Sequence, residues 1–305
     1  MTATLIPELE PGSAGWYQFM TASKVAAAMG LSPYESPFSL WHRMAGLIPP
    51  EPEDDQKRRG HYLEPAIRAW FADQHHYHSV ETTGTWVNEE RPWQAASPDA
   101  LVLYRDPKEP DVPVITDALA EFKTSHEDWD WGQPGTDDIP VHYRCQVMWQ
   151  MDCTGVHTCY VAVLTRHLEF VEYVVHWNEA EAMILREHAA GFMASIERGD
   201  RPDIDSHSQT YEAIRQLHPG IQQADIELDE DTTRAYCAAR VALDDAKAAE
   251  QYAKSLVADR LGNAKRARFA GQTIAQRQAK GLDGIPYLVA GRNLPGLTTR
   301  TESVA

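Results

Sequence analysis

Two carboxylates and a lysine stand at the ends of two apolar runs that follow each other in the chain. Asp99 precedes the first run, and Glu121 and Lys123 end the second run, at 118–123. If 118–123 is a β-strand, Glu121 and Lys123 share one face while Phe122 points into a core. Carboxylates hold Mg²⁺, and a lysine can orient or deprotonate a water that attacks a phosphodiester. The pattern is compatible with phosphodiester hydrolysis, but the spacing is weak alone, and taken in isolation it favours a solvent-exposed edge strand.

Length and composition predict a packed globular protein. The chain has 305 residues, of which 43% are hydrophobic, enough for one large domain or for a core domain with an appendage. No apolar run approaches the roughly 20 residues of a membrane span, and the first residues lack a basic segment followed by an apolar one. We therefore expect a cytoplasmic protein that makes no membrane contact.

The net charge of −17 is unevenly distributed along the chain. Residues 1–205 carry 15 Lys and Arg against 33 Asp and Glu, a balance of −18, whereas 206–305 carry 13 against 12, a balance of +1. Within 254–280 seven basic residues accompany a single acid, Asp259. This basic stretch is suited to nucleic-acid phosphates, and it is equally consistent with a solvated helix face.

The first helix is predicted over 21–30, and its start carries groups that could bind an anion. Thr21 is a plausible N-cap, alanines fill the interior, and Gly30 can end the helix in the left-handed conformation. The hydroxyl of Ser23 and the ammonium of Lys24 lie in the first turn, where free N–H groups also favour an anion. The segment is consistent with a phosphate site or with an ordinary capped helix.

Two further helices are predicted to carry polar groups toward a site. The stretch 57–71 is amphipathic, and Glu64 lies beside its apolar stripe. In the helix predicted over 143–151, Tyr143, Gln146 and Gln150 share one face, and two amides in an otherwise apolar helix need partners. That face is therefore expected to look into a polar cleft.

Other segments complete the expected elements. The polar loop 124–138 contains two tryptophans and is expected to lie over the site. A hairpin is predicted at 161–164 and 170–175, followed by a long helix from 178 to 197. Further on, 229–261 is predicted as a long helix and 273–278 as one strand of a small hairpin.

Five short segments in this order resemble the YqaJ-type viral recombinase family, the exonucleases similar to that of phage lambda. The segments are Met20-Thr21-Ala22-Ser23, Gly60-x-x-x-Glu64, Ala96-Ser97-Pro98-Asp99, Glu121-Phe122-Lys123 and Tyr143-x-x-Gln146. The resemblance covers about residues 16–200. It departs from the family at Gly15-Trp16-Tyr17-Gln18-Phe19, where relatives carry an arginine that binds a 5′ phosphate.

The resemblance implies an α/β fold with a restriction-endonuclease-like PD-(D/E)xK core, in which helices flank a mixed central sheet. We expect a loose N-terminal arm at 1–15, the nuclease domain at 16–205, and a helical C-terminal appendage with a small hairpin at 206–305.

The resemblance also implies roles for individual residues. Asp99, Glu121, Glu64 and the carbonyl of Phe122 would hold Mg²⁺, or Mn²⁺ in its place, with two ions per site. Lys123 would serve the attacking water, and Gln146 would hold the polar network of the cleft. DNA contacts are expected from five residues, namely Thr21, Ser23, Lys24, Ser97 and Tyr143.

The implied activity is metal-dependent 5′→3′ digestion of one strand at double-stranded DNA ends, which leaves single strands for recombination. The implied partners are a single-strand annealing protein and further copies of the chain, as in a ring trimer, in a bacterial host cell where a phage or prophage encodes the protein.

Two alternatives stay open. One is a structure-specific or restriction-type endonuclease on the same core, which would cut the closed circular DNA that an exonuclease leaves intact. The other is a catalytically silent DNA-binding recombination scaffold that uses the basic stretch 254–280, and it would bind DNA without releasing nucleotides.

Overall fold

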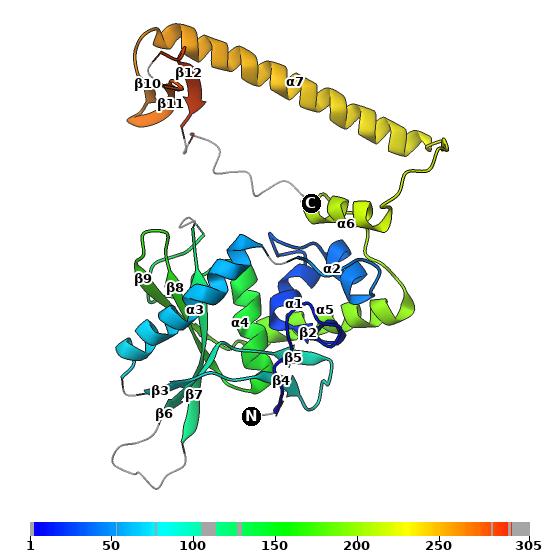
Figure 1. Cartoon of the computed structure of the whole chain (residues 1–305), viewed down its shortest axis with the longest axis vertical. Coiled ribbons are helices and arrows are strands. Elements are labelled where there is room, and N and C mark those ends of the chain that lie inside the picture. Colours follow the sequence, from blue (N-terminus) through cyan, green and yellow to red (C-terminus); the bar gives the residue numbers. More distant parts are fainter. Residues whose placement is uncertain are drawn as a thin grey trace. The chain divides into compact units, whose positions relative to one another are not determined.

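The computed structural model describes residues 3–52, 54–76, 78–104, 114–126, 130–281, 283–291 and 294. The chain divides into two compact units, Met1–Ile221 and Gln222–Ala305. The elements of each unit are labelled in Figure 1.

A five-stranded mixed sheet forms the centre of the first unit. Its strands lie in the order β3-β6-β7-β8-β9. They comprise β3 (His78–Glu81), β6 (Ala100–Tyr104), β7 (Ile115–Thr124), β8 (Thr158–Leu164) and β9 (Phe170–His176). Only β7 and β8 run parallel, and α4 connects them. A parallel pair needs such a crossover, because its strands begin at the same end of the sheet.

Helices cover both faces of this sheet, as Figure 1 shows for α3 (Asp55–Gln74) and α4 (Val141–Thr154). On one face, Ile67 and Phe71 of α3 pack against alanines and Phe122 of the sheet. On the other face, Leu119 and its neighbours pack against α4 in the larger core cluster. Since side chains alternate along β7, the face that buries Leu119 also receives Glu121 and Lys123. The predicted α/β architecture, a mixed central sheet flanked by helices, is confirmed.

A second, four-stranded sheet lies in the same unit, with the order β1-β4-β5-β2. Its strands are β1 (Ala3–Ile6), β4 (Thr85–Asn88), β5 (Gln94–Ala96) and β2 (Met20–Thr21). The N-terminal segment therefore differs from the loose arm expected at 1–15, since Ala3–Ile6 pairs antiparallel with Thr85–Asn88. The segment has little apolar periodicity of its own, and its order comes from backbone hydrogen bonds to a distant strand.

The first unit also contains the short 3₁₀ turn η1 (Trp16–Gln18) and three more helices. They are α1 (Ala22–Ala28), α2 (Pro37–Met44) and α5 (Glu179–Arg198). The helix α6 (Ser208–Leu217) then packs on α2, where Ala213 joins a buried cluster with Phe38 and Ile48. Because α6 buries one face against α2, it belongs to the first unit, and the division between the units falls at Ile221. The sequence placed this boundary at 205.

The second unit consists of α7 (Glu230–Leu261) and a three-stranded antiparallel sheet. Its strands are β10 (Arg266–Phe269), β11 (Gln272–Gln278) and β12 (Tyr287–Ala290), in that order. The long helix and the strand at 273–278 were predicted, whereas β10 and β12 were not. In the described part of the chain, no helix combines the length and the apolarity that a membrane span needs.

Candidate active site

Asp99 lies immediately before β6, and Glu121 lies on the neighbouring strand β7 of the central sheet. Ala100 pairs with Ala120 across β6 and β7, so Asp99 lies beside Glu121 at the end of this ladder. The backbone N–H of Phe122 donates to Asp99 Oδ2 at 2.7 Å. This bond fixes the Asp99 carboxyl against the strand that carries Glu121, because an amide donor stabilises an ionised acceptor strongly.

The Glu121 carboxylate is 1% exposed and receives three side-chain hydrogen bonds. The ammonium of Lys123 and the amide of Gln146 donate to Oε1, the latter at 2.5 Å. The amide of Gln150 donates to Oε2 at 2.7 Å. A buried carboxylate needs such donors, since burying an unpaired charge costs far more than a single hydrogen bond provides.

Gln150 is a site residue that the sequence grouped with Gln146 without assigning it a role. It is fully buried, and its Oε1 has no hydrogen-bond partner among the described residues. The signal was present in the sequence, since both amides share one face of the helix predicted at 143–151. Only the structure shows that both amides reach the same carboxylate, 25 and 29 residues earlier in the chain.

The carboxyl groups of Asp99, Glu121 and Glu64 repel one another in this cluster. Burial raises the pKa of Asp99 well above its usual range, and the charge of Glu121 raises it further. Glu64 of α3 is half-buried, and burial followed by the charge of Glu121 raises its pKa too. Burial lowers the pKa of Lys123, but its attraction to Glu121 and Asp99 outweighs burial and gives a net increase. The structure thus brings four predicted site residues, Asp99, Glu121, Lys123 and Glu64, into electrostatic contact.

The donor types in this cluster suit a hard divalent cation. Mg²⁺ and Mn²⁺ prefer carboxylate and carbonyl oxygens, which Asp99, Glu121, Glu64 and the Phe122 carbonyl offer. The described residues contain no preformed group of three His, Cys, Asp or Glu side chains that could hold a metal ion. Glu121 is instead engaged by Lys123 and the two amides, so its oxygens would have to exchange some of these donors for an ion.

An aromatic wall borders Lys123. The Lys123 ammonium lies 5.1 Å from the centre of the Tyr143 ring, and Trp131 stacks on Tyr143 with ring centres 5.5 Å apart. Trp131 belongs to the loop predicted to lie over the site, and its indole N–H donates to Ser125 at 3.1 Å. Residues 127–129 of this loop, with its other tryptophan, lie outside the described residues.

The chain matches one known domain family. Residues 16–157 match the sequence model of the YqaJ-like viral recombinase domain. This stretch contains every predicted site residue. The match covers 142 of the 305 residues, slightly less than half of the chain. The predicted family resemblance is therefore confirmed for this part of the chain.

Solved structures similar to the chain include exonucleases. An alkaline exonuclease, LHK-Exo, from Laribacter hongkongensis is 22% identical, and the likeness covers 61% of this chain and 92% of that one with a TM-score of 0.47. The same protein in complex with dAMP has a TM-score of 0.48 at the same identity and coverage. A phage-related exonuclease from Haemophilus somnus 129PT is 10% identical over 61% of this chain and 96% of that one, with a TM-score of 0.44. No curated protein matches the chain.

Within the stretch that matches this family model, Lys24 does not present its charge to solvent as the sequence suggested. It is 1% exposed, and its ammonium donates to the carbonyls of Trp16 and Phe19 at 2.5 and 2.8 Å. The same group lies 3.5 Å from the centre of the Trp16 ring. Burial lowers the pKa of Lys24 to about 6. Lys24 is therefore corrected from a DNA contact to a buried lysine that anchors η1, because the aromatic residues before α1 fold over it.

The other residues predicted to contact DNA differ in their exposure. Ser23 and Ser97 are exposed, whereas Thr21 is buried with its hydroxyl 3.2 Å from that of Ser23. The Ser97 hydroxyl lies 2.8 Å from that of Thr85. Tyr143 is half-buried beside Lys123. Ser23, Ser97 and Tyr143 thus expose polar surface that a DNA strand could contact.

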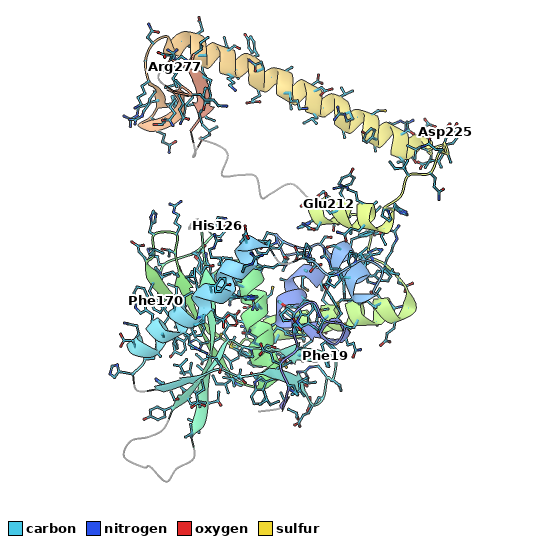
Figure 2. All side chains as sticks on the ribbon, in the orientation of Figure 1. Phe19, His126, Phe170, Glu212, Asp225 and Arg277 are labelled. Carbon is cyan, nitrogen blue, oxygen red and sulfur yellow. The ribbon has the colours of Figure 1, made fainter. Side chains whose placement is uncertain are left out.

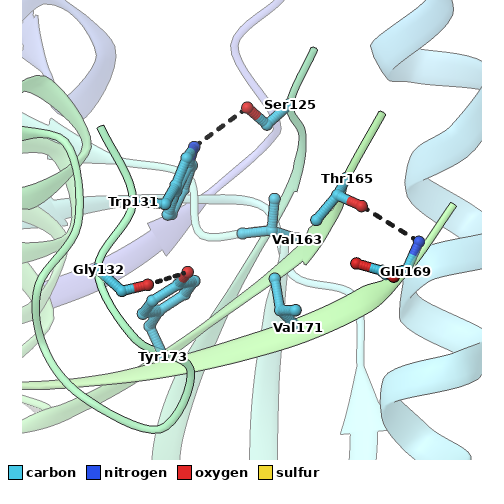
Figure 3. A pocket seen from close by; sticks show the side chains of 8 residues that line it. All are labelled: Ser125, Trp131, Gly132, Val163, Thr165, Glu169, Val171 and Tyr173. Carbon is cyan, nitrogen blue, oxygen red and sulfur yellow. Dashed lines mark hydrogen bonds between the residues drawn. The ribbon is translucent and has the colours of Figure 1, made fainter. Parts of the chain in front are cut away.

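Trp131 also lines a pocket of about 220 Å³ (Figure 3). Trp131 and Tyr173 line it with ring centres 5.1 Å apart, and the Tyr173 hydroxyl donates to the Gly132 carbonyl at 3.0 Å. Val163 and Val171 form an apolar part of the lining. None of Asp99, Glu121, Lys123 or Glu64 lines this pocket, so the charged cluster and the pocket are separate features joined through Trp131 and Tyr143.

Proposed function

We propose that the protein is a metal-dependent deoxyribonuclease that digests linear double-stranded DNA from its 5′ ends and leaves single strands for recombination by annealing. The observation that carries the proposal is that Asp99, at the start of β6, lies beside Glu121 of the adjacent strand β7, to which Lys123 is bonded. The YqaJ-like viral recombinase domain over 16–157 supports it, since it contains all of these residues.

In this proposal the chain positions the reacting groups through buried contacts. Asp99, Glu121, Glu64 and the Phe122 carbonyl would hold Mg²⁺ or Mn²⁺. A bound ion of this kind would supply charge stabilisation at the phosphate oxygens and lower the pKa of the attacking water. Phe122 N–H orients the Asp99 carboxyl, and Gln146 and Gln150 orient Glu121.

Lys123 contributes a positive charge next to the carboxylates. Its ammonium can orient a water beside Glu121 or donate to a phosphate oxygen as negative charge develops there. The ion pair with Glu121 holds this ammonium in place, and the Tyr143 ring lies 5.1 Å from it. A lysine restricted in this way loses less entropy when it engages a phosphate.

A ring-shaped assembly of several copies and a single-strand annealing partner belong to the same proposal. Residues 1–205, which lie in the first unit, carry the whole acidic excess of the chain, with a balance of −18. An acidic surface grips duplex DNA weakly at physiological salt, because non-specific affinity depends on phosphate neutralisation. A ring that encloses the duplex would retain it without a strong grip.

The test is nucleotide release from a linear duplex labelled separately at its 5′ and 3′ ends. We expect early release of the 5′ label in Mg²⁺, no release in chelator, and no cutting of closed circular DNA. Asp99→Ala and Lys123→Ala should abolish release while the circular dichroism spectrum stays unchanged. Early 3′ release would overturn the direction, cut circles would indicate an endonuclease, and full activity in either variant would overturn the site.

A further inference from the structure

The pocket lined by Trp131 lies on the same face of the central sheet as Lys123. Lys123 pairs with Val163 across β7 and β8, and Val163 pairs with Val171 across β8 and β9. Paired residues on neighbouring strands point to the same side of a sheet. Both valines line the pocket, so its floor begins one strand away from the lysine. With a strand spacing of about 4.8 Å, this floor lies roughly 5 to 10 Å from Lys123.

The start of β9 shows which other side chains face the pocket. Phe170, labelled in Figure 2, stacks on Trp70 of α3 with ring centres 5.2 Å apart, on the other face of the sheet. Because side chains alternate along a strand, its neighbours Glu169 and Val171 point to the pocket side, and both line the pocket. The pocket thus combines an apolar floor with an exposed carboxylate at its rim.

Hydrogen bonds within the protein fix the aromatic side of the pocket. The indole N–H of Trp131 donates to Ser125 on the same side of the sheet. In the same loop, the backbone N–H of Gly135 donates to the carbonyl of Glu172 on β9 at 2.7 Å. These bonds hold the Trp131 ring over the sheet without any ligand. A site that is already formed loses less free energy on binding than one that must first be ordered.

The size and the lining of the pocket suit a single nucleobase. An apolar cavity of about 150 Å³ is large enough for benzene. This pocket measures about 220 Å³, which leaves room for a somewhat larger ring. Trp131 offers a stacking surface on one side, and Figure 3 shows Thr165 and Glu169 on the other. The Glu169 carboxylate repels a phosphate, so a nucleotide would place its base here and its phosphate elsewhere.

We propose that this pocket receives the base of the nucleotide at the cleaved end of the DNA strand, while the phosphate of that nucleotide lies beside Lys123. One sugar joins a phosphate to its base, which fits a pocket that begins one strand away. Enzymes that take a base out of its stack bind it by stacking and by hydrogen bonds to its pairing edge. A carboxylate only accepts hydrogen bonds, so Glu169 favours a base with an amino group, such as that at C4 of cytosine.

The inference rests on the proposed function, which supplies the position of the phosphate, but mononucleotides test it apart from catalysis. They contain no bond to a second nucleotide that the protein could cut. Isothermal titration calorimetry of the full chain in Mg²⁺ would compare dCMP with dUMP, which carries an oxygen in place of the C4 amino group. We expect dCMP to bind about tenfold more tightly, because it makes one more hydrogen bond to a charged acceptor.

Two variants change separate parts of the pocket. Glu169→Gln should remove the preference for dCMP over dUMP, because an amide donates as well as accepts. Val171→Phe should weaken the binding of both nucleotides at least tenfold, because the larger ring fills the floor. The matched controls make the same replacements at exposed positions of other elements, Glu187→Gln on α5 and Val241→Phe on α7. Both controls should bind the two nucleotides as the wild type does.

Three results would overturn the proposal. In the first, neither nucleotide binds the wild type, or dUMP binds as tightly as dCMP. In the second, Glu169→Gln keeps the preference for dCMP. In the third, Val171→Phe keeps wild-type affinity while its circular dichroism spectrum matches that of the wild type.

Digestion of end-labelled linear duplex separates this inference from the proposed function. A chain that binds dCMP through the pocket but releases no nucleotides in Mg²⁺ would contradict the proposed nuclease and leave the pocket standing. A chain whose Val171→Phe variant digests DNA with an unchanged KM would contradict the pocket and leave the nuclease standing.

Discussion

Gln150 and Glu121 form a fully buried pair between α4 and β7, in which the amide donates to the carboxylate at 2.7 Å. The bond joins the helix on one face of the central sheet to the strand that carries the charged cluster. Because Gln146 also donates to Glu121, one carboxylate ties two turns of α4 to the site. The orientation of Glu121 is therefore set by the packing of α4.

Replacing Gln150 should affect both stability and activity. Gln150→Leu leaves Glu121 Oε2 without its donor in a buried place, which we expect to lower the free energy of unfolding by about 1–3 kcal/mol. Nucleotide release should fall at least tenfold, because Glu121 can then turn away. Urea unfolding and end-labelled digestion measure the two effects.

Gln251→Leu is the matched control for this substitution, since Gln251 lies on the exposed surface of α7. Gln251→Leu should change neither the free energy of unfolding nor the rate of nucleotide release by more than experimental error. An unchanged unfolding energy in Gln150→Leu would contradict the buried contact.

Removing the charge of Asp99 should stabilise the fold while it stops catalysis. Burial and the charge of Glu121 raise the pKa of Asp99, so its ionised form is less favourable in the folded protein than in the unfolded chain. The asparagine of Asp99→Asn can still accept from Phe122 N–H. We expect a higher melting temperature in chelator at pH 8 and a loss of activity of about a hundredfold or more. A melting temperature below that of the wild type would contradict the electrostatic account.

Mg²⁺ should raise the melting temperature of the wild type. A ligand that binds only the native state stabilises it by about 2.7 kcal/mol at a hundredfold excess over its dissociation constant. Asp99→Asn and Glu64→Gln should each reduce this gain, because each removes one of the repelling carboxylates. Asp225→Asn, at an exposed position of the second unit, is the control and should show the same rise in melting temperature as the wild type. An equal rise in melting temperature in the wild type and in all three variants would show that Mg²⁺ binds elsewhere.

Lys24 should make stability depend on pH. Its pKa is lowered from 10.5 to about 6 by burial, so between these pH values the unfolded chain binds one more proton at Lys24 than the folded protein does. The free energy of unfolding therefore gains, from this group, up to about 1.4 kcal/mol per pH unit as pH rises above 6. Lys24→Met should lack this contribution, which urea unfolding at pH 6.5, 7.5 and 8.5 would reveal.

Lys57→Met, which removes an exposed lysine, provides the comparison. Parallel curves for the wild type and Lys24→Met would show that Lys24 keeps its proton in the folded state. The two carbonyls and the Trp16 ring around its ammonium would then outweigh burial.

Elements with strong local signals were predictable from the sequence. Ser36-Pro37 opens α2 with a capping box, Asn178 caps α5, and Asp229 caps α7, each through a side-chain bond to a nearby backbone N–H. These contacts lie within three residues of the cap, so the local sequence determines them. By contrast, β1, β3 and β10 are short strands whose order depends on partners elsewhere in the chain, and the sequence did not predict them.

By itself, the sequence determined which residues could do chemistry and which strand and helix faces carry them. Alternation put Glu121 and Lys123 together, and helical spacing put Gln146 and Gln150 on one face. Only the tertiary structure decided that both amides bond to Glu121 and that Lys24 is buried under Trp16. The reason is that periodicity specifies direction within one element, whereas hydrogen-bond partners and burial depend on how separate elements pack together.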